Sequence, residues 1–79
     1  MLTPKITSVK PMAEHTLHVC FENGKCGIFD VKPYIRGSWF SELADENYFR
    51  QVYIIDDGCG IEWPNGQDIA PHELYDMAV

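Results

Sequence analysis

The chain has 79 residues, 46% of them hydrophobic and ten of them aromatic, so it encodes a folded domain rather than a disordered segment. A chain of this length buries only about 60–65% of its unfolded surface, which excludes a deep catalytic cleft between two lobes. We expect a single domain over residues 1–79, and a homo-oligomer would be one way to enlarge so small a core.

The net charge of −6 is unevenly distributed along the chain. Residues 1–36 hold five bases and three acids, a net charge of +2, whereas residues 37–79 hold nine acids and one base, a net charge of −8. The acidic half disfavours direct nucleic-acid binding, which needs clustered Lys and Arg side chains. It suits a basic protein partner, and a solvated surface that keeps a small protein in solution has the same composition.

The sequence shows no signal peptide and no apolar run near the roughly 20 residues that a membrane span needs. Three cysteines is an odd number, which fits a reducing compartment better than a disulfide framework. We therefore expect a cytoplasmic protein that makes no membrane contact.

The first predicted strand covers residues 5–10. Pro4 and Pro11 lie at its ends and favour an edge position, where a missing N–H costs no ladder bond. A hairpin follows, with strands at 16–21 and 25–30, because Asn23-Gly24 is the preferred centre of a two-residue type I′ turn.

The two-residue turn predicts which side chains share a face of the hairpin. The core face would carry Leu17, Val19, Phe21, Cys26 and Ile28. The other face would carry His18, Cys20, Glu22, Lys25, Gly27 and Phe29.

Cys20 and Cys26 lie on opposite faces in this register, so they are expected neither to form a disulfide nor to share a metal ion. Their C-x5-C spacing also differs from the C-x2-C pairs of zinc sites. We predict Cys26 to be a small core residue, and we predict no metal site and no cofactor.

Residues 31–52 lack the alternation of a strand. We expect a helical turn at 31–35 ended by Gly37, a short helical segment capped by Ser38 or Ser41, and a helix over 45–52 whose early acids suit the helix dipole. The predicted core anchors of this region are Phe40, Leu43, Phe49 and Val52.

The remaining residues predict a second hairpin, with strands at 53–56 and 60–63, and a final helix at 72–78. Asp57-Gly58 forms the hairpin turn, and Pro71 suits the first turn of the helix. The chain is thus predicted to be a small α+β domain with two β-hairpins forming an antiparallel sheet, short helices between them and a C-terminal helix.

One stretch, residues 61–69, combines a large aromatic, a tight turn and a lone acid. We assign it a structural role, with Trp63 in the core, Pro64, Asn65 and Gly66 in a turn, and Asp68 accepting backbone N–H groups near the last helix. A ligand-facing role for Asp68 remains open at this point.

No residue is predicted to be catalytic, because no nucleophile has a base at a recognisable spacing. The alternative is a small enzyme or ligand-binding domain that uses Asp68, His18 and Asp30, whose side chains would then have to meet at one substrate.

Several motifs together resemble the small bacterial family catalogued as domain of unknown function 2442. They are the opening Lys5-Ile6-x-x-Val9, the Leu17-x-Val19-x-Phe21-x-Asn23-Gly24 hairpin, and the Trp63-Pro64-Asn65-Gly66-x-Asp68 box. The resemblance spans Lys5 to Tyr75 and implies a compact α+β fold of unestablished function. The chain departs from the family pattern at Ala70, where a Ser cap is usual.

The resemblance also implies a biological setting. Relatives are often encoded beside a second small protein, in an arrangement resembling toxin–antitoxin pairs. Some relatives append a helix-turn-helix DNA-binding domain, for which this chain has no matching segment. The family offers no catalytic residues that could be carried over.

We therefore expect a non-enzymatic protein-binding or regulatory module, antitoxin-like in a two-protein system, whose partner is a small basic protein encoded nearby. The predicted contact residues lie in the acidic half, where Trp is a typical interface anchor; they are Trp39, Glu42, Asp45 and Glu46. A regulatory domain related to the helix-turn-helix fusions is a further alternative, without direct nucleic-acid binding by this chain.

Overall fold

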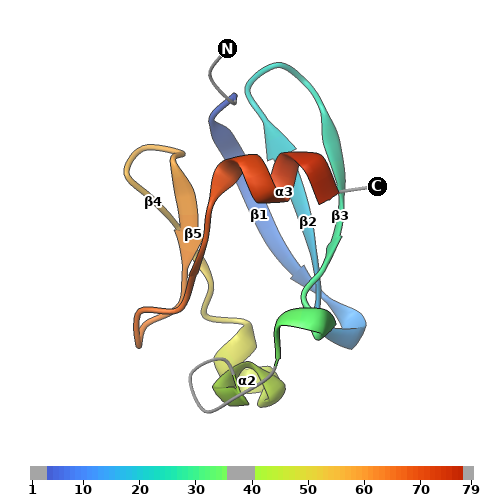
Figure 1. The fold of residues 1–79 in the computed structure, drawn as a ribbon, viewed down its shortest axis with the longest axis vertical. Coiled ribbons are helices and arrows are strands. Elements are labelled where there is room, and N and C mark those ends of the chain that lie inside the picture. Colours follow the sequence, from blue (N-terminus) through green and yellow to red (C-terminus); the bar gives the residue numbers. More distant parts are fainter. Residues whose placement is uncertain (1–3, 36–40, 78–79) are drawn as a thin grey trace.

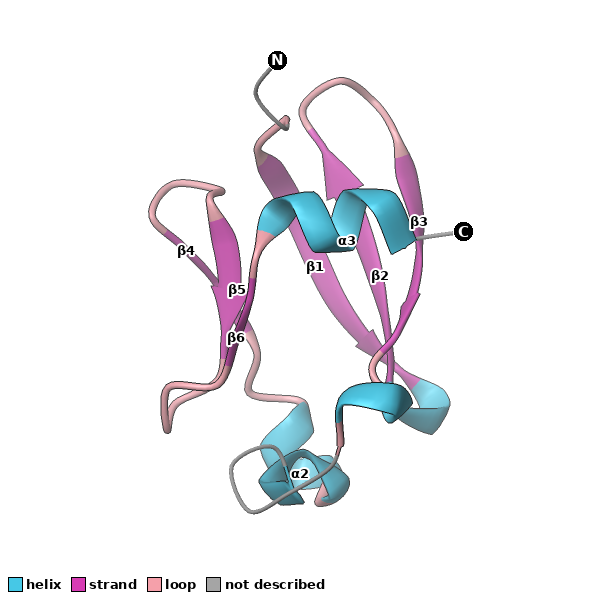
Figure 2. Cartoon of the chain, in the orientation of Figure 1, coloured by secondary structure: helices cyan, strands magenta, loops and turns pink. Residues whose placement is uncertain are grey.

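Two three-stranded antiparallel sheets and a set of short helices form the computed structural model, which describes residues 4–35 and 41–77 (Figures 1 and 2). Sheet A has the order β1 (Ile6–Met12), β2 (Thr16–Phe21), β3 (Cys26–Asp30), and sheet B has the order β4 (Tyr53–Ile55), β5 (Gly60–Glu62), β6 (Asp68–Ile69). The 3-10 helices are η1 (Ala13–His15), η2 (Lys32–Tyr34) and η3 (Ser41–Ala44), and the α-helices are α2 (Glu46–Phe49) and α3 (Pro71–Met77).

The predicted α+β class, both hairpins and the C-terminal helix are confirmed. The two hairpins belong to separate antiparallel sheets instead of the one predicted sheet, and β6 is an additional strand that was not predicted from the sequence. β6 has only two residues, too few for a visible alternation.

The first strand lies at the edge of sheet A, as its prolines indicated. It is longer than predicted, because it continues through Pro11, which pairs with Leu17, to Met12. The edge position makes this possible, since a missing N–H on the open side of a strand breaks no ladder bond.

The register of the first hairpin differs from the prediction by one residue. Cys20 pairs with Cys26 and Val19 pairs with Gly27, so the loop has three residues instead of two. Gly24 alone in this loop has a positive φ, +90°, whereas a type I′ turn needs φ > 0 at both central residues. The loop is a turn followed by a glycine bulge, closed by Phe21 N–H donating to Lys25 O at 2.8 Å.

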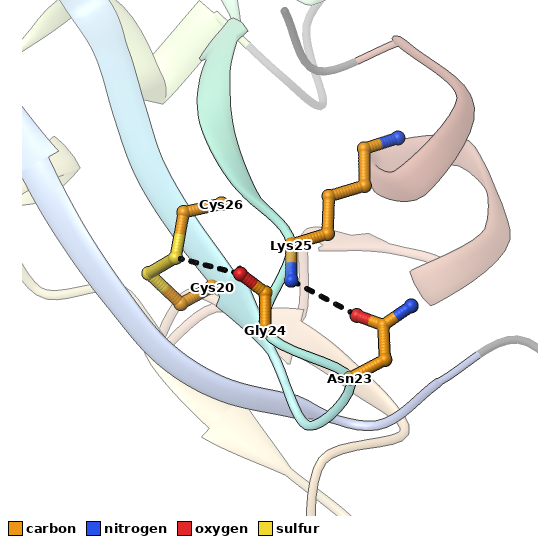
Figure 3. Close-up of a disulfide and its surroundings, with 5 residues drawn as sticks. All are labelled: Cys20, Asn23, Gly24, Lys25 and Cys26. Atoms are coloured by element: carbon orange, nitrogen blue, oxygen red, sulfur yellow. Dashed lines mark hydrogen bonds between the residues drawn. A yellow bond between two sulfur atoms is a disulfide. The ribbon is translucent and has the colours of Figure 1, made fainter.

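This shift turns the side chains of β3 over, because neighbouring residues of a strand point to opposite faces. Gly27 and Phe29, expected on the outside, are buried. Cys26, expected in the core, is exposed, and Ile28 is only half-buried. Cys20 and Cys26 therefore face each other on the outer side of sheet A and form a disulfide, which corrects the prediction that they could not (Figure 3).

The core lies between the two sheets and under α3, which crosses the inner face of sheet A (Figure 1). Predicted anchors Leu43, Phe49 and Trp63 are buried, and Val52 packs against the core half-buried. Phe40 lies outside the described residues. The fully buried core residues include Leu17, Val19 and Phe29 of sheet A, Val31 directly after β3, Ile61 of sheet B and Leu74 of α3.

The helices between the sheets are shorter than predicted. η3 begins at Ser41, whereas Ser38 and Gly37 lie outside the described residues. α2 covers only Glu46–Phe49 of the predicted 45–52, and its N-cap is Asp45, whose carboxylate accepts the N–H of Asn47 at 2.9 Å. Such a cap satisfies one of the free N–H groups of the first helical turn.

Candidate functional site

The Trp63-Pro64-Asn65-Gly66 segment joins sheet B to the helical region through buried contacts. The indole of Trp63 is completely buried and donates from Nε1 to the carbonyl of Phe49 at 2.8 Å. The Gly66 N–H donates to Trp63 O at 2.9 Å, which closes the predicted tight turn. This geometry gives the aromatic and the turn the structural role that the sequence suggested.

Gln67, for which the sequence predicted no role, is the polar centre of this segment. It is completely buried, its Oε1 accepts from the Tyr48 hydroxyl at 2.6 Å, and its Nε2 donates to Glu42 at 2.9 Å. The same Glu42 carboxylate accepts from Asn65 Nδ2 at 2.7 Å, and the Tyr48 hydroxyl accepts the Asn65 N–H at 2.8 Å.

Asp68 lies on β6, exposed, and pairs across the strands with Glu62. Among the described residues, no hydrogen bond or ion pair uses its side chain. The predicted acceptance of backbone N–H groups near the last helix is therefore not made by Asp68 within the described residues, and the buried side chain of its neighbour Gln67 contacts Tyr48 and Glu42 instead.

The outer face of sheet B presents one row of side chains, one from each strand. Tyr53 pairs with Glu62, and Glu62 pairs with Asp68, so the three side chains project on the same side. The opposite row is apolar, with Ile61 and Ile69 buried and Ile54 half-buried. We call the row of Tyr53, Glu62 and Asp68 the acidic face.

Tyr53 is 42% exposed, and its hydroxyl donates to Glu62 Oε1 at 2.6 Å. That hydrogen bond raises the pKa of the Tyr53 phenol, because the proton is shared with a carboxylate. Sheet B strands contain no Lys, Arg or His. The acidic face thus combines an exposed aromatic ring with two carboxylates, which the predicted β4–β5 pairing and the unpredicted pairing of β5 with β6 bring together.

The four predicted contact residues have different surroundings. Trp39 lies outside the described residues. The Glu42 carboxylate accepts hydrogen bonds from Asn65 and Gln67, and the Asp45 carboxylate caps α2. Both carboxylates are thus used in contacts within the domain. Glu46 is exposed in the first turn of α2.

The alternative catalytic set is divided between the sheets. His18 lies half-buried on the outer side of β2, Asp30 ends β3, and Asp68 lies on β6 in the other sheet. No hydrogen bond or ion pair among the described residues joins any two of them. The structure gives this set no shared geometry on which to build a mechanism.

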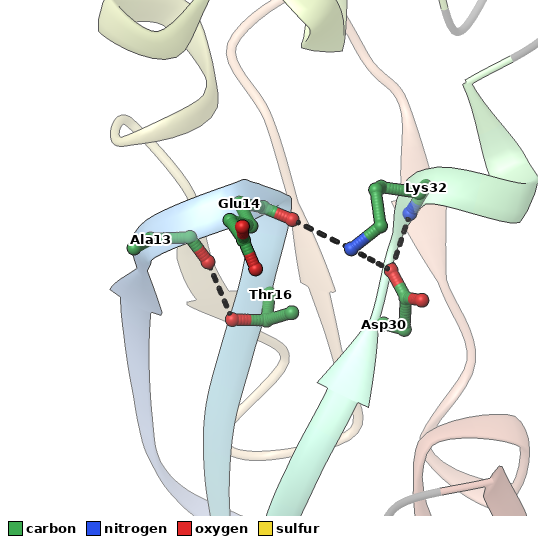
Figure 4. A network of polar contacts seen from close by, with 5 residues as sticks. All are labelled: Ala13, Glu14, Thr16, Asp30 and Lys32. Carbon is green, nitrogen blue, oxygen red and sulfur yellow. Dashed lines mark hydrogen bonds and ion pairs between the residues drawn. The ribbon is translucent and has the colours of Figure 1, made fainter.

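Asp30 instead takes part in a local polar network (Figure 4). Its carboxylate accepts the backbone N–H of Lys32 at 2.9 Å, and the Lys32 ammonium lies 3.2 Å away. The backbone hydrogen bond, together with that ammonium, lowers the pKa of Asp30. Lys32 Nζ also donates to Glu14 O at 3.0 Å, so the network fastens η1 to the end of β3.

A hollow of about 440 Å³ lies where the two sheets meet, between the start of β1 and the β4–β5 turn. Its charged groups are already paired. The Lys5 N–H donates to Glu22 at 2.8 Å, and the Lys5 ammonium lies 3.8 Å from Asp57. The Ile6 N–H donates to Gly58 O at 2.9 Å, so this region serves as the seam between the sheets.

Among the residues that the structure describes, no three His, Cys, Asp or Glu side chains gather in a way that could hold a metal ion. No helix within residues 4–35 and 41–77 has the length and hydropathy needed to cross a bilayer.

Fold and surface together define a small α+β domain with two sheets, a buried glutamine that hydrogen-bonds to Tyr48 and Glu42, and one acidic sheet face. The chain matches the family described as Protein of unknown function (DUF2442) over residues 6–79 and belongs to that family. No curated protein and no solved structure shows significant similarity to the chain.

Proposed function

We propose that this chain is a non-catalytic protein-binding module with an antitoxin-like role, and that it binds a small basic protein encoded beside its own gene. The binding surface is the acidic face, formed by Tyr53, Glu62 and Asp68. This moves the expected contact away from Glu42 and Asp45, whose carboxylates are engaged within the domain.

The acidic face is the observation that carries the proposal. An exposed tyrosine beside carboxylates can accept a guanidinium group in two ways, because the ring binds a cation by its π face and the carboxylates accept its N–H groups. Glu62 Oε2 and both oxygens of Asp68 have no hydrogen-bond partner among the described residues. They remain available to donors on a partner.

The charge of the whole chain supports the same kind of partner. The half that contains the acidic face carries a net charge of −8, which steers basic proteins toward it and repels acidic ones. Tyr and Arg are also typical of the residues that dominate binding energy at interfaces.

The test is co-expression with the neighbouring basic protein, followed by size-exclusion chromatography at low and at high salt. We expect the two proteins to elute together at low salt and the complex to weaken as salt screens the charges. Separate elution at low salt would overturn the proposal.

Variants locate the surface. Tyr53→Ala is expected to weaken binding about tenfold or more, as truncation of an interface aromatic does. Glu62→Gln with Asp68→Asn should weaken it strongly, whereas Asp56→Asn with Asp57→Asn removes the same charge from the exposed β4–β5 turn and should have little effect. Equal losses in the two double variants would indicate non-specific attraction to a negative protein instead of binding at the acidic face.

A further inference from the structure

The Cys20–Cys26 disulfide lies on the outer side of the first hairpin, next to its loop (Figure 3). Cys26 is exposed and Cys20 is half-buried, so a reductant in solution can reach the bond. The neighbouring pair, Phe21 with Lys25, is hydrogen-bonded. Hydrogen-bonded and non-hydrogen-bonded residue pairs alternate along an antiparallel ladder, so the cysteine pair has no backbone hydrogen bonds of its own. The disulfide is therefore the direct link between the two strands at this pair.

The other side of the same hairpin holds the C-terminal helix. Asn23 Nδ2 donates to the Tyr75 hydroxyl at 3.0 Å, and Lys25 Nζ donates to the Tyr75 carbonyl at 2.8 Å. The Lys25 ammonium lies 3.9 Å from the centre of the Tyr75 ring, and Phe21 contacts that ring edge to face at 5.0 Å. Three residues at the hairpin end therefore contact one residue of α3.

The rest of α3 is held differently. Leu74 is completely buried in the core and its N–H donates to Ala70 O at 3.2 Å, which secures the start of the helix. Glu73 lies beside the Tyr34 phenol of η2. Beyond Leu74, the polar contacts that fasten the described part of α3 run to Asn23 and Lys25 in the hairpin.

We propose that the Cys20–Cys26 disulfide is a redox-sensitive cross-link that determines how stably the C-terminal half of α3 packs against the first hairpin. An external dithiol breaks the one S–S bond by supplying two electrons and two protons, which leaves two thiols, and is itself oxidised to a disulfide. The bond closes a ring of seven residues that includes both Asn23 and Lys25, so its loss frees the loop that positions them. Loosening of Tyr75 then uncovers the ring of Phe21.

The experiment is hydrogen exchange of the full chain, followed amide by amide, in a Cys59→Ser background that removes the exposed free thiol. The oxidised protein is compared with the same protein in dithiothreitol. We expect the α3 amides beyond Leu74 to exchange about tenfold faster after reduction, as expected for local opening once a short loop is released. The amides of β5 should not change.

Two variants connect the effect to its cause. Cys20→Ser with Cys26→Ser should exchange like the reduced protein and should not respond to dithiothreitol. Lys25→Met removes the ammonium from Tyr75, so its α3 should exchange quickly in the oxidised state and respond little to reduction. The proposal is overturned if reduction speeds amide exchange only in residues 20–26, or if it speeds exchange equally in β5 and α3. Both outcomes are measured on the protein that keeps Cys20 and Cys26, so they do not depend on the folding of the serine variant.

Discussion

Gln67 allows the sharpest test of how this domain is held together. Its side chain is completely buried between the Tyr48 hydroxyl and the Glu42 carboxylate. Substitution of Gln67 by Leu keeps a similar volume and removes both polar ends. The change leaves Tyr48 without its acceptor and Glu42 without one of its donors.

The magnitude follows from the hydrogen bonds that the Gln67 side chain makes with Tyr48 and Glu42. A hydrogen bond to a charged group contributes about 1.5–3 kcal/mol net, and one between neutral groups about 1 kcal/mol. Glu42 is exposed and retains Asn65, so the lower end of the first range applies. We expect Gln67→Leu to lower the free energy of unfolding by about 2–3 kcal/mol, a decrease in Tm of about 10–20 °C for a domain of this size.

Urea unfolding followed by circular dichroism measures this loss, and Gln51→Leu is the matched control. Gln51 is exposed, and its Nε2 donates to Asn47 O at 3.3 Å, so its replacement should change the free energy of unfolding by less than about 0.5 kcal/mol. If the two variants unfold at the same urea concentration, the buried amide contributes nothing specific and the reasoning is wrong. A double variant with Tyr48→Phe should show a coupling energy of about 0.5 kcal/mol or more.

Three further changes test other parts of the fold. Gly58→Ala should destabilise the seam by about 2 kcal/mol or more in urea unfolding, because φ is +103° and a Cβ would lie 2.8 Å from Ile6 O. Asp45→Ala should lower the free energy of unfolding by about 1 kcal/mol through loss of the N-cap, with a smaller effect for Asp45→Asn. Partial burial and, as a smaller cause, the Glu73 carboxylate raise the pKa of Tyr34 from 10.0 to about 12. The stability that the protonated Tyr34 phenol contributes is therefore complete below pH 10 and decreases as the pH rises toward 12. Ultraviolet titration of this phenol should show a lower pKa in Glu73→Gln.

The predictions that succeeded depend on local chemistry. The strand at 16–21 was predicted from its alternation and matches β2 to the residue. Trp63 was placed in the core and Asn65-Gly66 in a turn, and both placements are confirmed because an aromatic residue and a turn pair determine their own environments. The edge position of β1 was predicted from Pro4 and Pro11, whose missing N–H is also a local property of the chain.

The predictions that failed, or that could not be made, depend on contacts between distant segments. Gln67 is important only because Glu42 and Tyr48, on two other segments, supply its partners. The acidic face also needs the pairing of β5 with β6, a strand of two residues that shows no alternation in the sequence. Pairing information of this kind is absent from local patterns.

The wrong register predicted for the first hairpin shows that one additional loop residue decides which side chains of β3 are buried. Asn-Gly is compatible both with a two-residue type I′ turn and with the last two positions of a three-residue loop that ends in a glycine bulge. Local preference favours the first, but the second buries Phe29 in place of Ile28, which puts a larger apolar side chain into the core. The same choice turns both cysteines to the outer side, directly opposite each other. Tertiary burial therefore overrides the preferred turn. The disulfide, which the predicted register excluded, follows from that shift of one residue.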